Sequence, residues 1–509
     1  MLADQRRAAM DAIFFPKSIA FVGASNNLNK WGFLILHNLL MGGFEGPIYP
    51  VNLKEKTILG LPAFPSVTAI PHPVDQAIFT IPAERIPAAI AECGPKGVRA
   101  GIVISAGMGE LGEQGKELEA RMVAEARRAG MVLVGPNGQG VACPKAKLYP
   151  WMPAFLPPPG PIAFIAQSGN VQTWVLQYLD RVGFGVSKTV SMGNAADLQA
   201  ADYLRYLQRD PDTRVIVLYL EGLSQGREFM EAARSVSLAK PVVLVKAGRT
   251  EAGAQAARSH TGVLVGADQV FDAACRQAGI IRADTLEEGA ISAAALAGIP
   301  LPAGRRVGIV TGGGGLGVIA ADAGVAAGLE VARLGERTCE RLRKLLPPWW
   351  VPGNPVDLVA GLGYAGPREI IPILLEEGDV DGVIMISLGW ANSMAEVYAK
   401  HSPLRQHTDL TPFIAERLQR DREYCRQLAD LIEKYQKPIY FVGPSVAHVI
   451  ERGWTGMADI LRRGYMIFPS IESSVRAFAA MARYRRFQEL AGSSQKPQEP
   501  PAPARAAER

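Results

Sequence analysis

One of the six histidines, His260, has the sequence context of a nucleophile. It lies in AGRTEAGAQAARSHTGVLVG, a segment rich in small residues and glycine that predicts an exposed loop. An imidazole on such a loop is well placed to attack phosphorus, although loop histidines in general are inert. The sequence predicts no metal site, because no histidine has a companion at metal-ligand spacing. The remaining histidines are His37, His72, His401, His407 and His448.

Glu221 is the candidate for a group that orients His260. It ends the apolar run VIVLYLEG, which predicts a buried strand, and α/β sheets keep their sites at the carboxyl ends of strands. A carboxylate that accepts from one imidazole nitrogen fixes the tautomer and leaves the other nitrogen free to attack. Sequence separation alone does not bring the two residues together, and the alternative is a carboxylate merely solvated at a strand end.

A glycine-containing turn, VGASNNLNKWG at residues 22–32, follows a predicted strand and opens a predicted helix. Free N–H groups and the helix dipole favour a phosphate there. The turn is not an NAD fingerprint, because Ser25 replaces the second glycine and no acidic residue ends the second strand. Lys54, which follows that strand, suits a phosphorylated ribose and favours CoA or NADP. The alternative is a strand-to-helix turn with no ligand.

Two further turns have the composition of anion sites. In IAQSGNVQTW, residues 165–174, small side chains at Ser168, Gly169 and Asn170 begin a predicted helix and suit an oxyanion; the alternative is an ordinary N-cap made by Ser168. In TGGGGLGVIAAD, residues 311–322, four consecutive glycines leave a backbone bare enough to wrap an anion. A purely structural glycine run is the alternative there.

The elements that position these residues predict an α/β protein, because short apolar runs alternate with segments of helical period. Residues 1–143 predict a Rossmann-like domain. The proline-rich stretch MPAFLPPPGP, residues 152–161, then separates a second block at 152–298, and GIPLPAGRR precedes a third at 303–487. The charged stretch 395–436 predicts a helical elaboration between two strands of the third block. Residues 488–509 predict a disordered tail.

Composition excludes several classes of protein. An apolar fraction of 48% and a charged fraction of 20% indicate a globular chain, and a net charge of +5 does not argue for a nucleic-acid groove. No run reaches the roughly 18 apolar residues of a membrane span, and the N-terminal stretch lacks a signal-peptide core. The five cysteines are dispersed and odd in number, which predicts a reducing cytoplasm and neither disulfides nor zinc.

Taken together, the motifs resemble the NDP-forming acyl-CoA synthetases, the family that includes succinyl-CoA synthetase and the ADP-forming acetyl-CoA synthetases. The resemblance covers roughly residues 10–485. It rests on motifs in the family's order: VGAS with Lys30, VNLK, IVISAG, GPNGQG, AQSGN, YLEG, KAGRT, SHTG, TGGGGLGV and NPVDL. The fold it implies is a Rossmann-like CoA-binding domain followed by two flavodoxin-like domains.

The resemblance also implies site residues. His260 would be the phosphorylated histidine and Glu221 its carboxylate partner. Two helix starts from different domains would converge on the phosphate, one at Ser168–Asn170 and the other at Gly313, Gly314 and Gly315. CoA would be bound by Gly23, Ala24, Ser25, Lys30, Asn52 and Lys54, with Ser105 near the thiol end.

The implied reaction interconverts acyl-CoA, ADP and phosphate with carboxylic acid, CoA and ATP, through an acyl phosphate and phospho-His260. All three blocks are accounted for without an ATP-grasp module, so the resemblance implies that ADP or ATP with Mg²⁺ binds to a separate ATP-grasp beta subunit. The helical elaboration at 395–436 departs from the short acetyl-type members and leaves the acyl group open.

Three alternatives remain at this point. A protein acyltransferase of the same domains would need an acetyltransferase domain, for which the tail is too short. A non-catalytic CoA-binding regulatory protein would not need His260, Glu221 and both glycine turns. An NADP oxidoreductase would leave SHTG and the glycine run unexplained.

Overall fold

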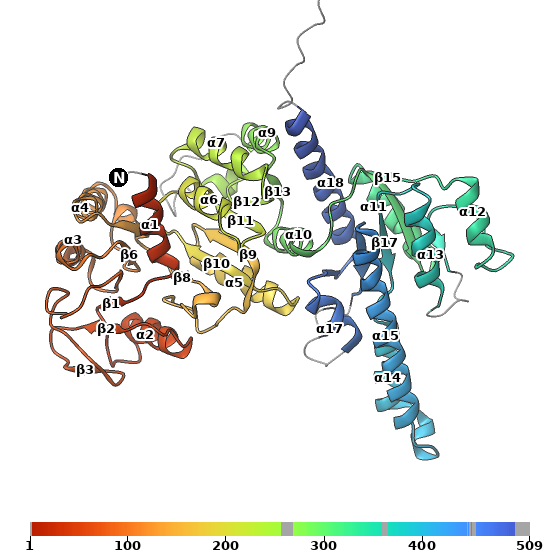
Figure 1. Cartoon of the computed structure of the whole chain (residues 1–509), viewed down its shortest axis with the longest axis horizontal. Helices are drawn as coiled ribbons and strands as arrows, with labels where there is room; N and C mark the ends of the chain where they lie inside the picture. Colours follow the sequence, from red (N-terminus) through yellow and green to blue (C-terminus); the bar gives the residue numbers. More distant parts are fainter. Residues whose placement is uncertain are drawn as a thin grey trace, which may run out of the picture.

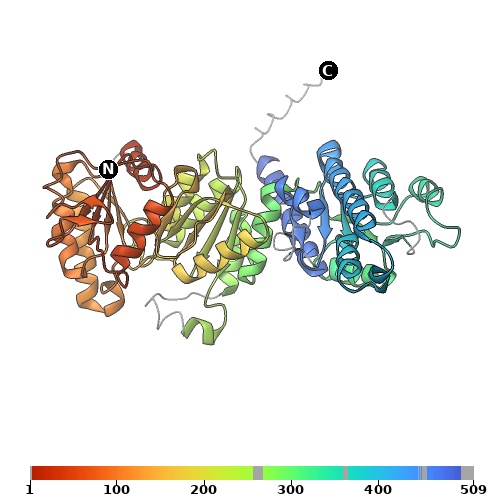
Figure 2. The same ribbon diagram turned by 90° about the horizontal axis from the view of Figure 1, so that it is seen from below.

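The computed structural model describes residues 3–255, 268–358, 365–444, 446, 449 and 455–493. Within them the chain forms three large sheets, each flanked by helices (Figure 1). Figure 2 shows the sheets following one another along the molecule, in the order of the sequence. The α/β prediction is confirmed.

The first sheet contains five strands, and helices cover it. The strands are β1 (Ile19–Val22), β2 (Ile48–Val51), β5 (Gln76–Phe79), β6 (Ala100–Val103) and β7 (Val132–Val134); the helices are α1 (Ala3–Phe14), α2 (Trp31–Met41), α3 (Ile86–Ala91) and α4 (Glu113–Arg128). All strand pairs are parallel, in the order β2-β1-β5-β6-β7. The chain leaves β1 toward β2 and then crosses to β5 on the other side. The carboxyl ends of β1 and β5 therefore form the switch point where such sheets bind ligands.

The second sheet has the order β13-β12-β11-β9-β10-β8. Its strands are β8 (Gly140–Ala142), β9 (Pro159–Ala166), β10 (Val186–Ser191), β11 (Val215–Leu220), β12 (Val242–Lys246) and β13 (Ile281–Ala283); its helices are α5 (Gly169–Arg181), α6 (Ala200–Gln208), α7 (Gly226–Ser237), α9 (Asp268–Ala278) and α10 (Leu286–Gly298). Ile162 and Phe164 of β9 pack in the core with α5 and α10, whereas Ala163 and Ile165 pack with α6 and α7. Burial on both faces explains why the sequence of β9 is continuously apolar.

The third sheet is parallel, in the order β15-β14-β17-β18-β19, with β16 also paired to β14. Its strands are β14 (Arg306–Thr311), β15 (Glu330–Val331), β16 (Val356–Asp357), β17 (Gly382–Ile386), β18 (Ile439–Val442) and β19 (Ile467–Phe468). Its helices are α11 (Gly314–Ala326), α12 (Glu336–Arg343), α13 (Ala365–Glu376), α14 (Trp390–His401), α15 (Thr411–Tyr435), α17 (Thr455–Arg462) and α18 (Ile471–Ser493). Helices α10 and α18 pack against each other and join this sheet to the second.

Three further segments bear on the predictions made from the sequence. The stretch 395–436 is largely helical, and α14 and α15 lie side by side as a hairpin between β17 and β18 that projects from the third sheet (Figure 1). Strand β8 pairs antiparallel with β10, so the end of the first predicted domain contributes a strand to the second sheet. Helix α18 continues to Ser493, so the first residues of the expected tail, Gln488–Ser493, are helical.

Candidate active site

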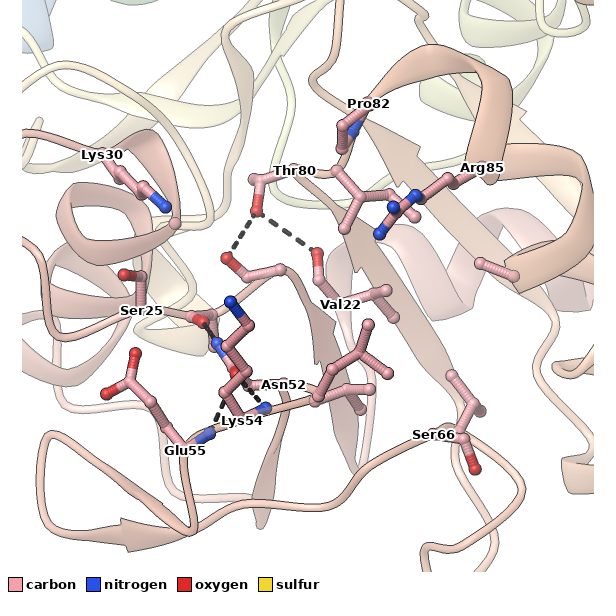
Figure 3. A pocket seen from close by; sticks show the side chains of 18 of the residues that line it. Val22, Ser25, Lys30, Asn52, Lys54, Glu55, Ser66, Thr80, Pro82 and Arg85 are labelled. Atoms are coloured by element: carbon pink, nitrogen blue, oxygen red, sulfur yellow. Dashed lines mark hydrogen bonds between the residues drawn. The ribbon is translucent and has the colours of Figure 1, made fainter.

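A cavity of about 940 Å³ opens at the carboxyl ends of β1 and β5 (Figure 3). Its wall contains all six residues expected from the first turn and from the end of β2. These residues are Gly23, Ala24, Ser25, Lys30, Asn52 and Lys54. The fold thus brings the two segments to the switch point.

Gly23 makes the sharp turn out of β1. Its φ is +96°, and an added Cβ would lie 2.6 Å from Oγ1 of Thr80, so only glycine fits. Thr80 directly follows β5, and its hydroxyl donates to the carbonyls of Val22 and Gly23 at 3.2 and 3.1 Å (Figure 3). Thr80 ties the two strands together at the switch point. Thr80 was not predicted from the sequence, although a hydroxyl directly after a buried strand was a signal.

Asn52 and Ser25 hold the loops that form the cavity wall. Nδ2 of Asn52 donates to the carbonyl of Ala24 at 2.8 Å, and its Oδ1 accepts from the N–H of Lys54 at 2.8 Å. Ser25 is buried, and its Oγ accepts from the N–H of Asn27 at 3.1 Å. These bonds fix the backbone of the two loops, so both side chains shape the cavity through the main chain.

Three cations reach the cavity from different elements. Lys30 precedes α2, Lys54 follows β2, and Arg85 precedes α3 (Figure 3). In the described part of the chain none of the three forms an ion pair with a carboxylate. Three carboxylates also line the cavity, those of Glu55, Glu84 and Glu92. Since none of them pairs with the three cations, each cation is free to bind a phosphate. Arg85 was not anticipated from the sequence.

A second cavity, of about 790 Å³, adjoins the first and shares Trp31 and Thr80 with it. Ser105 lines this second cavity, and its Oγ donates to the carbonyl of Ile81 at 2.6 Å. The turn Ser168–Asn170 lines the same cavity. The structure thus separates Ser105 from the other candidate CoA residues and places it in the cavity that the turn Ser168–Asn170 lines.

Contacts between the first two domains form one wall of the second cavity. Nδ2 of Asn194, which follows β10, donates to Glu110 at 2.7 Å and to Glu119 at 2.9 Å. Burial raises the pKa of Glu110, but hydrogen bonds from Asn194 and from the main chain outweigh it and leave that pKa below its usual value. An ionised Glu110 therefore helps to hold the two domains together across the cavity. These three residues were not predicted from the sequence.

The turn before α5 leaves its N–H groups uncapped by side chains. Ser168 is the N-cap residue, with extended backbone and no side-chain cap hydrogen bond, which contradicts the ordinary N-cap alternative. At Gly169 an added Cβ would lie 2.2 Å from Cγ of Gln139. Nε2 of Gln139 donates to Oδ1 of Asn170 at 2.8 Å. Gln139, from the GPNGQG motif, therefore orients this turn and requires glycine in it.

Glu221 lies at the carboxyl end of β11 and is only 7% exposed. Its neighbour in the sheet is β12, which ends at Lys246. Nζ of Lys246 donates to the carbonyl of Glu221 at 2.8 Å, and burial lowers the pKa of Lys246. Gln167, which lines the second cavity, also bonds to the main chain of Glu221. The main chain of Glu221 is thus bonded to the residue that precedes Ser168, and Glu221 lies at the carboxyl end of its strand, as the sequence predicted.

His260 lies outside the described residues, so its pairing with Glu221 stays a prediction. The segment that contains it follows β12, the strand adjacent to β11.

The glycine run begins α11 in the third domain. Gly313 is its N-cap residue, and its N–H donates to Oγ1 of Thr311 at 3.1 Å. An added Cβ at Gly312, Gly313 or Gly315 would meet no atom within 4 Å. The cavity that Ser168–Asn170 lines does not include the glycine run, so the convergence of the two turns on one phosphate stays a prediction.

Other expectations concern metals, membranes and cysteines. The described residues contain no group of side chains that would hold a metal ion. In the same part of the chain no helix has the length and apolar character needed to cross a bilayer. All five cysteines are buried and free, and burial raises the pKa of Cys93 to about 12 and of Cys143 to about 11.

The chain matches three family models along its length. They are a CoA binding domain at residues 17–144, a succinyl-CoA ligase like flavodoxin domain at 159–296 and a ligase-CoA domain at 307–397. Each of these three residue ranges contains most strands of one of the three sheets.

Named relatives and solved structures extend the match to whole proteins. Acetate–CoA ligase [ADP-forming] I subunit alpha of Pyrococcus furiosus is 43% identical over 70% of this chain and 79% of its own length. The 4-hydroxybutyrate–CoA ligase [ADP-forming] of Nitrosopumilus maritimus is 35% identical over 73% of this chain and 54% of its own. The structure of a dinucleotide-forming acetyl-coenzyme A synthetase 1 from Ca. Korarchaeum cryptofilum, with phosphate and ADP, is 31% identical, with a TM-score of 0.81 over 96% of this chain and 100% of that one. The chain therefore belongs to the NDP-forming acyl-CoA synthetases, a family of acid–thiol ligases.

Proposed function

We propose that this chain is the CoA-binding, phosphohistidine-carrying subunit of an ADP-forming acyl-CoA synthetase. The observation that carries the proposal is the junction of the two cavities at Trp31 and Thr80. A CoA whose phosphates lie near Lys30 and Lys54 would extend its thiol end past this junction toward Ser105. The acyl group would then lie beside the uncapped turn at Ser168.

In the first step an oxygen of inorganic phosphate attacks the thioester carbon. A C–O bond forms, the C–S bond breaks and CoA leaves as a thiolate, which gives an acyl phosphate. The free N–H groups at the start of α5 stabilise the negative charge of the phosphate without having to reorganise.

In the second step a nitrogen of His260 attacks the phosphorus of the acyl phosphate. An N–P bond forms, the P–O bond to the acyl group breaks and the carboxylate leaves. Glu221 would accept a hydrogen bond from the other ring nitrogen and stabilise the positive ring. An oxygen of ADP then attacks the same phosphorus, the N–P bond breaks, and ATP and free His260 result. Gly313–Gly315 would bind the phosphoryl group during one of these transfers.

The nucleotide belongs, in this proposal, to an ATP-grasp beta subunit that also holds Mg²⁺, whose charge would offset that of the phosphates. The lengths of the relatives support a partner. Two Pyrococcus furiosus proteins named subunit alpha are covered for 79% and 82% of their length, whereas an Archaeoglobus fulgidus ligase named without a subunit is covered for 54%. The buried free cysteines suit the cytoplasm as its compartment.

The test is labelling of the purified chain with radioactive phosphate and a panel of acyl-CoAs. The relatives' names include acetate, 4-hydroxybutyrate and trans-feruloyl, so the panel should cover short, hydroxylated and aromatic acyl groups. Acid-labile, base-stable label with one acyl-CoA would support the proposal and identify the acyl group. CoA binding without label, also when an ATP-grasp partner is added, would favour a non-catalytic CoA-binding protein.

A further inference from the structure

Gln167 connects the turn Ser168–Asn170 to β11, the strand that Glu221 follows. It stands between β9 and Ser168, and its N–H donates to the carbonyl of Tyr219 at 3.1 Å. This bond continues the pairing of β9 with β11 beyond the last paired residues. The backbone of Gln167 is therefore fixed relative to β11 before its side chain is considered.

The side-chain amide of Gln167 then binds the main chain just after β11. Its Oε1 accepts from the N–H of Glu221 at 2.5 Å and from the N–H of Gly222 at 3.1 Å. Its Nε2 donates to the carbonyl of Gly222 at 3.1 Å. One planar amide thus satisfies three main-chain groups, which requires an acceptor and a donor on the same side chain.

Lys246 holds the same segment from the opposite side. Its Nζ donates to the carbonyl of Glu221 at 2.8 Å and to that of Ala247 at 2.5 Å. The N–H of Glu221 is therefore held from β9 and its carbonyl from β12. A main chain anchored on both sides fixes the point from which the Glu221 side chain extends, relative to the turn at Ser168.

We infer that Gln167 is a positioning residue, which fixes the Glu221 carboxylate relative to the phosphate-binding start of α5. The inference rests on the proposed function, since it needs both groups to act on one phosphorus. Gln167 lines the second cavity, but its amide is occupied by Glu221 and Gly222. It therefore acts through Glu221.

Two variants of Gln167 remove different numbers of its side-chain hydrogen bonds. Gln167→Met keeps the length of the side chain and removes all three hydrogen bonds. Gln167→Glu keeps both acceptor bonds and loses the donor bond to Gly222. A misplacement of about 1 Å costs up to roughly 100-fold in rate, so we expect falls on the order of 100-fold for Met and tenfold for Glu.

The measurement is the rate of acid-labile labelling of the full chain by radioactive phosphate and its active acyl-CoA. The rate at saturation, the acyl-CoA concentration for half-maximal rate and the Kd of CoA are measured for each variant. The matched control is Gln208→Met, because Nε2 of Gln208 also donates to a main-chain carbonyl, that of Ser235 at 3.1 Å, between α6 and α7.

A positioning role predicts that the saturated rate falls in the order Gln, Glu, Met, while the half-saturating concentration and CoA binding stay unchanged. If Gln167→Met does not fold, the same fall in Gln167→Glu with intact CoA binding supports the role. A wild-type rate in Gln167→Glu and Gln167→Met, or a fall matched by Gln208→Met, would overturn it while the proposed function stands. Absence of label in the unaltered chain, also when an ATP-grasp partner is added, would instead overturn the proposed function and this inference with it.

Discussion

The turns that begin α5 and α11 look alike in sequence, but the first is closely packed by the protein and the second is open. Gly169 is packed so closely against Gln139 that no side chain fits, and the turn forms part of a cavity wall. Gly313 and Gly315 have open space where a side chain would be. Both turns begin helices without a side-chain cap, and these helices pack on α10 and α18, which join the two domains.

A glycine in such a turn can be required by packing within the protein or by an external group that approaches the turn. At Gly169 the protein's own packing explains the residue, so its presence alone says little about a ligand. At Gly313 and Gly315 packing explains nothing, and neither residue has a positive φ that would require glycine. The open turn is therefore the stronger sign of an external group, either a phosphate or a protein surface.

Among variants of residues that the structure describes, the largest effect is expected from Gly169→Ala. Its methyl group would lie 2.2 Å from Cγ of Gln139, so we expect a loss of roughly 1–3 kcal/mol in the free energy of unfolding. Labelling should fall by about 100-fold, because the start of α5 must move. Urea unfolding and labelling measure the two effects. Adding Gln139→Ala removes the two closest contacts and should restore part of the stability, whereas a fully stable and active Gly169→Ala would refute the packing argument.

Glu221→Gln tests the carboxylate at the carboxyl end of β11. Loss of the charge that stabilises the protonated ring should lower the labelling rate by about 100-fold with CoA binding unchanged. Glu228→Gln is the control, because Glu228 pairs with Arg205 on the surface of the same domain. Equal labelling rates in Glu221→Gln and Glu228→Gln would show that the Glu221 carboxylate takes no part in the reaction.

Gly315→Ala tests the open turn. Since the added methyl meets no atom and alanine favours a helix, the free energy of unfolding should stay the same or rise by about 0.4–1 kcal/mol. The labelling rate, or the transfer to ADP with the partner present, should fall by roughly tenfold, because the methyl narrows the approach of an anion. Gly324→Ala, in the same helix and away from the turn, provides the control. Wild-type rates in both steps for Gly315→Ala would mean that the open turn has no part in the chemistry.

The smallest effect on transfer is expected in the first cavity. Lys54→Met should weaken CoA binding about tenfold, which corresponds to about 1.4 kcal/mol, and reduce its dependence on salt. The labelling rate at saturating acyl-CoA should not change. The cations of the first cavity would then act in CoA binding, and the two turns in phosphoryl transfer. Lys145→Met serves for comparison, since Lys145 pairs with Asp212. Equal CoA affinity in the two variants would contradict a role for Lys54 in binding.

The strands were predictable wherever burial on two faces made them continuous apolar runs, as in β9 and β11. Strand β8 escaped prediction. Gly140–Ala142 of β8 carry no periodicity, and only pairing with β10 makes them a strand. The helical hairpin at 395–436 was visible because its charged stretch keeps a helical period.

The site was predictable where local sequence carries the signal, namely glycines after strands and a carboxylate at a strand end. Thr80 and Gln139 were missed because their partners are distant in sequence, and Arg85 because only the fold brings it to the cavity. Thr80 bonds to Gly23, and Gln139 packs on Gly169. Only the parallel sheet, which places successive strand ends together, makes these pairs neighbours.

The central claim is that phosphate passes from an acyl-CoA to His260. The most direct measurement labels the unaltered chain, His260→Ala and His37→Ala with radioactive phosphate and the active acyl-CoA. The account predicts acid-labile label in the unaltered chain and in His37→Ala, with none in His260→Ala although it still binds CoA. Label of equal amount in His260→Ala would contradict it.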